Sequence, residues 1–202
     1  MLKLIGMTAE TLEEFKGHLA DNYSIFKIRW DGRRPLYENP EAKCIEIPFP
    51  KAAGEFAHLA TRLPTLSPMD AAEWDGGALV YTDWGIWDQS ASLAGYQMVE
   101  RIRSTFGEHR PFNVATVNRF RADEQPLLAN FILAALIYGW DAYYFPNYGG
   151  CFAHISHDEW CCIVTESNED FKNVAEPHLK DPDGGCRVLE NWPSPRPALN
   201  PL

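Results

Sequence analysis

A long, almost entirely apolar run over residues 127–138 constrains the fold more than any other part of this sequence. Asp123 is placed to cap a helix over this run, and Pro126 falls in its first turn, where a missing N–H is harmless. Gly139 supplies a residue that tolerates the left-handed conformation in which many helices end. A helix that is apolar on nearly every side must be covered on nearly every side. The sequence therefore predicts a central apolar helix over residues 123–138, in the middle of the core.

Shorter stretches on both sides of this helix have the alternation of strands or the apolar stripe of surface helices. Their order indicates an α+β (mixed α/β) fold, in which helices pack on a single mixed β-sheet. A first helix opens at Thr8 or Thr11, and Thr11 has capping-box spacing with Glu14. Further helices are predicted over 52–63, 93–106 and 168–176, and strands over 24–30, 44–49, 78–82, 111–120, 140–145, 151–156 and 160–165.

The chain of 202 residues is long enough for one domain with a substantial core. Residues 1–180 carry the predicted helices and strands, and we expect them to form a single globular domain. Residues 181–202 contain repeated prolines, which favour an extended chain. We therefore expect a proline-rich C-terminal tail.

The chain is acidic, with 28 Asp and Glu against 18 Lys and Arg, and a formal net charge of −10. Nucleic acid and anionic membranes bind basic surfaces, so neither is an expected partner. The charge fits a basic protein partner, and it equally fits solubility alone. No basic and apolar leader is apparent, and the five cysteines follow no disulfide pattern. We therefore expect a cytoplasmic protein.

Motifs that would identify a common enzyme class are not found. The sequence has no phosphate-binding Gly-Lys-Ser/Thr loop, no G-x-G-x-x-G, no G-x-S-x-G and no H-E-x-x-H. The cysteines have no zinc-ligand spacing, because neighbours such as Cys161 and Cys162 point to opposite faces of a strand. No cofactor and no catalytic residue are predicted, and the sequence leaves open whether the protein is an enzyme.

An aromatic and acidic loop after the predicted strand 78–82 is the first candidate site. Loops that follow interior strands often carry ligand contacts. Aromatic rings inside an acidic rim suit a basic protein, or a cationic or sugar-like ligand. The competing interpretation is that the rings belong to the core. The predicted partner-binding residues are Asp83, Trp84, Trp87, Asp88 and Tyr148.

A polar group near the end of the strand 151–156 is the second candidate. Its imidazoles and carboxylates are standard ligands for transition metals. On a regular strand the two histidines would point to opposite faces, so they can converge only if the backbone bends between them. If the segment is a turn, its side chains can simply bond to nearby backbone. The alternative ligand or metal site comprises His154, His157, Asp158 and Glu159.

Two functions follow from these candidate sites. The first is a small acidic protein that binds a basic protein partner; it resembles, at the level of protein class only, bacterial immunity or inhibitor proteins. The second is an enzyme or a small-ligand or metal-binding protein, with a site that joins the 83–88 loop to the segment 154–159. A bound metal, or a deep pocket that contains those residues with strongly perturbed ionisation, would favour the second function. An exposed acidic patch centred on Trp84 or Trp87, without a cleft, would favour the first.

Overall fold

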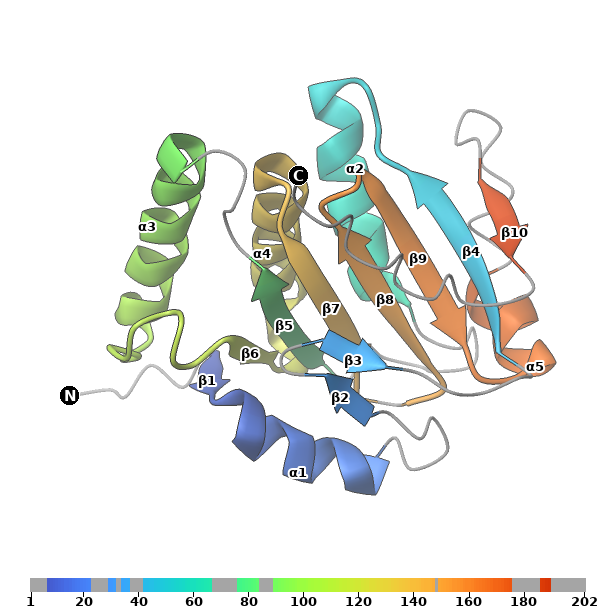
Figure 1. Cartoon of the computed structure of the whole chain (residues 1–202), viewed down its shortest axis with the longest axis horizontal. Coiled ribbons are helices and arrows are strands. Elements are labelled where there is room, and N and C mark those ends of the chain that lie inside the picture. Colours follow the sequence, from blue (N-terminus) through green and yellow to red (C-terminus); the bar gives the residue numbers. More distant parts are fainter. Residues whose placement is uncertain are drawn as a thin grey trace, which may run out of the picture.

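A computed structural model describes residues 7–22, 29–31, 34–36, 42–66, 76–83, 89–147, 149–175 and 186–189. Within these residues one large sheet has the strand order β1-β6-β5-β7-β8-β9-β4-β10, and a separate hairpin pairs β2 with β3 (Figure 1). The strands of the large sheet are β1 (Thr8–Glu10), β4 (Lys43–Pro48), β5 (Gly77–Asp83), β6 (Val117–Phe120), β7 (Asp141–Pro146), β8 (Cys151–Ser156), β9 (Trp160–Thr165) and β10 (Arg187–Leu189), and the hairpin has β2 (Arg29–Asp31) and β3 (Arg34–Leu36).

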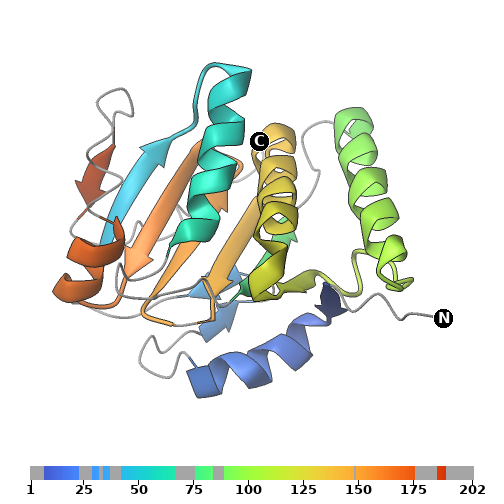
Figure 2. The same cartoon turned by 180° about the vertical axis from the view of Figure 1, so that it is seen from behind.

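The helices lie on both faces of the sheet. Figure 2 shows α2 and α4 against one face, with α3 on the far side of α4 from α2. Figure 1 shows α1 at the lower end of the opposite face. The helices are α1 (Leu12–Asn22), α2 (Ala53–Arg62), α3 (Gln89–Thr105), α4 (Gln125–Tyr138) and the short α5 (Asn168–Asp170), with single turns at η2 (Leu63–Thr65), η3 (Ala122–Glu124) and η4 (Phe171–Ala175).

The predicted α+β class, with helices packed on one sheet, is confirmed. In one detail the sheet differs from the mixed sheet that was expected, because every strand pairing in it is antiparallel. The strands β7, β8 and β9 follow one another through short turns, and strands joined in that way must run antiparallel.

The predicted central helix is confirmed as α4. Seven of its 14 residues are buried, whereas Ile137 is 59% exposed. Gly139 ends the helix in the left-handed region at φ 63°, and the N–H of Trp140 donates to Ala135 O. The start differs from expectation, since Asp123 does not cap α4. A turn at η3 precedes the helix instead, and there Glu124 Oε2 accepts the N–H of Arg121 at 2.9 Å.

The two faces of the sheet carry separate apolar cores. The larger core joins α2, α3 and α4 to the sheet, and the smaller one joins Phe15 and Leu19 of α1 to the other face. The capping box of α1 forms as predicted, since Thr11 N donates to Glu14 Oε2 at 2.6 Å and Glu14 N donates to Thr11 Oγ1 at 3.2 Å.

One predicted strand is shorter than expected. The strand predicted over 111–120 covers only β6, because the N–H groups of Val114 and Ala115 both donate to Pro111 O and fold the chain into a turn. The last helix, predicted over 168–176, forms as α5 followed by the wide turn η4, so the described residues 168–175 are helical. Of the strand predicted over 24–30, residues 24–28 lie outside the described residues.

The ends of the chain add two further observations. In the region predicted as a tail, β10 pairs with β4 at the edge of the sheet. The boundary at residue 180 stays a prediction. Among the described residues, no helix is both long enough and apolar enough to cross a membrane.

Candidate metal centre

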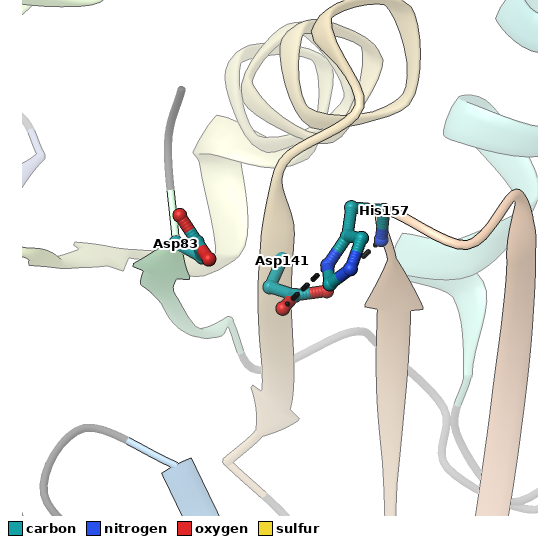
Figure 3. Close-up of side chains that lie close together, drawn as sticks. All are labelled: Asp83, Asp141 and His157. Atoms are coloured by element: carbon teal, nitrogen blue, oxygen red, sulfur yellow. Dashed lines mark hydrogen bonds and ion pairs between the residues drawn. The ribbon is translucent and has the colours of Figure 1, made fainter. Parts of the chain in front are cut away.

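Three neighbouring strands bring polar side chains together at one end of the sheet. Strand β5 ends at Asp83, β7 begins at Asp141, and His157 follows the last residue of β8. Because neighbouring strands run in opposite directions, the end of one lies beside the start of the next. Figure 3 shows Asp83 and His157 on either side of Asp141. One possible ligand atom from each of these residues lies within 4.8 Å of the others.

A β-bulge in β5 places Asp83 beside Asp141. Tyr81 pairs with Ala142, and in a regular ladder the next residue, Thr82, would stand opposite Asp141. The register shifts between Tyr81 and Asp83, so that Asp83 takes the position opposite Asp141. Without the bulge, Asp83 and Asp141 would point to opposite faces of the sheet. Bulges commonly redirect a side chain in this way next to functional sites.

A tight turn after β8 places His157. Ser156 pairs with Trp160, which leaves a three-residue loop, and Glu159 N donates to Ser156 O at 3.2 Å. Glu159 closes the loop in the left-handed region at φ 65°, the usual geometry of a three-residue hairpin. The backbone therefore bends between the two histidines, as their convergence requires.

Asp141 is the centre of the cluster and is only 5% exposed. Its Oδ1 accepts the backbone N–H of His157 at 2.9 Å. Its Oδ2 lies 2.9 Å from Nδ1 of His157, and His154 Nε2 lies 3.8 Å from Oδ1. The Nδ1 contact has the length of an ion pair without the alignment of a hydrogen bond. The other ring nitrogen of His157 lies 3.6 Å from Asp158 Oδ1.

These contacts set the ionisation of Asp141. Burial by itself raises the pKa of the carboxyl group, but the His154 imidazole and the backbone N–H of His157 outweigh it and lower the pKa to about 2. Asp141 is therefore a carboxylate at neutral pH, which is the form that binds metal ions.

His154 is held firmly behind this carboxylate. Its ring stacks on Tyr143 with centroids 4.2 Å apart and planes inclined by 6°, and it meets Trp160 edge to face at 4.9 Å. His154 thus contacts Asp141 from the strand interior, whereas His157 contacts it from the turn. The two predicted histidines converge on the same carboxylate.

The structure brings only part of each predicted site into this cluster. Asp83 comes from the first candidate site and His157 from the second, so one described residue of each segment lies in the cluster. Asp158 is exposed and its carboxylate lies on the side of His157 that faces away from Asp141, and Glu159 is exposed in the turn. The remaining predicted partner-binding residues, Trp84, Trp87, Asp88 and Tyr148, lie outside the described residues.

Asp141 is the functional candidate that the sequence interpretation missed. It stands at the start of a predicted strand in which the following residues are apolar. A carboxylate next to a run of buried strand residues could have identified it, because a buried charge needs a partner or a ligand.

A thiol site is not favoured by this geometry. Cys161 and Cys162 are fully buried on opposite faces of the sheet, as their adjacency predicted. Burial raises the pKa of the Cys161 thiol well above its ordinary value. The reactive thiolate form is therefore suppressed.

Comparison with known proteins gives no match: no protein-family model, no curated protein and no solved structure matches this chain.

Proposed function

We propose that this protein binds a divalent first-row transition-metal ion through Asp83, Asp141 and His157. The observation that carries the proposal is the convergence of two carboxylates, from β5 and β7, and one imidazole, from the turn after β8, within 4.8 Å. Two carboxylates so close together repel each other, and a cation between them removes that repulsion.

The arrangement around the cluster also suits a metal site. A metal with ligands at about 2.1 Å holds adjacent donor atoms roughly 3 Å apart, and Asp141 Oδ2 and His157 Nδ1 are separated by 2.9 Å. The opposite nitrogen of His157 faces Asp158, and carboxylates commonly orient metal-binding imidazoles from that side. The backbone N–H of His157 and the His154 ring fix Asp141 in the same manner.

The set of donors supports an open site. Three protein ligands leave coordination positions for water or a substrate, as in metal centres that act as Lewis acids. Carboxylate and imidazole donors together suit Mn²⁺, Fe²⁺ or Zn²⁺ better than Ca²⁺, which prefers oxygen ligands only. Metal-assisted hydrolysis is the reaction class that such a site would serve.

Calorimetric titration of metal-stripped protein with Zn²⁺, Mn²⁺ and Ca²⁺ tests the proposal. We expect one equivalent of Zn²⁺ or Mn²⁺ to bind, and Ca²⁺ to bind far more weakly. Asp83→Asn and His157→Gln should each weaken binding by more than about a hundredfold, because loss of a ligand exceeds the effect of losing an orienting partner.

Glu159→Gln is the matched control. It removes one negative charge from the same turn but from a side chain outside the cluster. If Glu159→Gln weakened metal binding as much as Asp83→Asn does, general electrostatic attraction would explain the binding. That result would contradict a defined metal site.

The immunity-like function, with a basic protein partner in the cytoplasm, stays a separate proposal. It is supported by the net charge of −10 and by the aromatic composition of the 83–88 loop. Its test is capture of a stoichiometric basic protein from the native lysate by wild type and by Trp87→Ala, which should lose it. Capture that is unchanged in Trp87→Ala would exclude this loop as the contact.

A further inference from the structure

A second polar feature centres on Arg103 of α3 and shares no residue with the metal cluster. Arg103 is one of the largest fully buried side chains, with 1% of its surface exposed. Its guanidinium carbon lies 5.4 Å from the centre of the Phe112 ring. An arginine in such a place keeps its charge, so it needs compensation from neighbouring groups.

The neighbouring carboxylates are committed to other partners. Glu108 accepts hydrogen bonds from Arg110 Nε at 3.0 Å and from Arg110 Nη2 at 2.7 Å. Glu100 Oε1 accepts the backbone N–H of Phe112 at 3.1 Å. Both carboxylates act on Arg103 through their charge, but no described residue accepts a hydrogen bond from its Nε, Nη1 or Nη2.

The surface beside Arg103 indicates where a partner for this guanidinium would come from. Arg103 is among the residues that line an open hollow between the C-terminal half of α3 and residues 108–111, and the exposed Arg101 lines it too. The indole N–H of Trp140 is also buried without an acceptor in the described structure, and its ring lies 6.0 Å from the same Phe112 ring. Positive charge and spare donors thus gather around one aromatic side chain.

We propose that Arg103 anchors a binding site for a small oxyanion, a phosphate or a carboxylate, that enters from this hollow. The planar guanidinium presents its donors as a fork that matches two oxygens of such a group. Arg103 itself is almost completely buried beside the Phe112 ring, and a hydrogen bond from a group shielded from water in this way is stronger than one in solvent. The site is distinct from the metal cluster and does not depend on it.

Calorimetric titration with inorganic phosphate and, separately, with acetate tests this site at constant ionic strength. We expect wild type to bind at least one of the two anions with one-to-one stoichiometry. Arg103→Met should weaken binding at least about tenfold, because the charge-assisted fork is lost. Arg101→Met is the matched control, since it removes a charge of the same sign from the same helix and hollow, and it should bind as wild type does.

The possible results distinguish anion binding by the buried Arg103 from general attraction of anions to a positive surface. Absence of binding by wild type to both anions overturns the proposal, and so does equal weakening by Arg101→Met and Arg103→Met. Arg103→Lys keeps the positive charge but lacks the paired N–H donors of the guanidinium. This variant tests the proposal if Arg103→Met does not fold. Weakened binding by this variant supports the proposal, and undiminished binding contradicts it.

Discussion

At the scale of single residues, the carboxylate of Asp141 connects the sheet to the candidate site. It receives the N–H of His157 and faces two imidazoles while it is almost completely buried. A buried carboxylate with such partners is stable only as long as they are present. Asp141 therefore has a structural task in addition to any task in metal binding.

The pH dependence of stability should show that structural task. The pKa of Asp141 falls from its ordinary 3.8 to about 2 in the folded protein, so its contribution is complete above about pH 4 and disappears as the pH falls toward 2. The pKa difference corresponds to about 2 kcal/mol. We expect metal-free wild type to lose about this much more unfolding free energy than Asp141→Asn between pH 4 and pH 2. Urea unfolding across this range measures it, and parallel curves for the two proteins would contradict the assignment.

Asp158 offers a finer test of how His157 is oriented. Its carboxylate lies 3.6 Å from the nitrogen of His157 that faces away from Asp141. Asp158→Asn should therefore weaken Zn²⁺ or Mn²⁺ binding about ten- to a hundredfold, without abolishing it. The free energy of unfolding of the metal-free protein should hardly change, because Asp158 is exposed. Metal titrations of Asp158→Asn and Glu159→Gln measure the difference in affinity. Identical affinities of the two variants would show that Asp158 does not orient His157.

At the scale of elements, sequence patterns predicted the regular parts and missed the irregular ones. The run 127–138 and the capping box at Thr11 depend on local chemistry, and both formed as expected. The bulge before Asp83 and the left-handed Glu159 depend on how strands pair, which no single segment reveals. The alternation of a strand places Asp83 and Asp141 on opposite faces, so their meeting could not be predicted from spacing.

The end of α4 provides a prediction for backbone energetics. Gly139 adopts φ 63° with open space around its Cα, so a side chain there would meet strain but no neighbour. Gly139→Ala should lower the free energy of unfolding by about 1 kcal/mol. Gly17, inside α1 and also in open space, is the control, and Gly17→Ala should raise stability by about 0.5–1 kcal/mol. Chemical denaturation measures both, and changes of the same sign would contradict the argument.

At the scale of the whole molecule, strand β10 lies apart from the candidate metal site. The contribution of the C-terminal region can therefore be tested separately from metal binding. Among the described strands β10 pairs with β4 alone, whereas the cluster lies at β5, β7 and β8. A chain that ends at residue 180 should fold cooperatively and keep its metal affinity, because the cluster is three strand positions away from β10. It should aggregate more readily, since β4 then becomes an exposed edge. Light scattering and metal titration measure the two effects, and loss of metal binding would contradict their independence.

The order of strands in the sheet also sets an order of events when the chain folds. Helix α4 and strands β7, β8 and β9 are consecutive, so their contacts close short loops, whereas β4 and β5 must find partners far along the chain. Asp141 and His157 therefore meet early, and Asp83 joins them when β5 docks between β6 and β7. Pulse-labelling hydrogen exchange during refolding should protect β7 to β9 before β5, and simultaneous protection would refute this order. A metal ion that needs all three side chains would hold the late strand in place and slow unfolding more than it speeds folding.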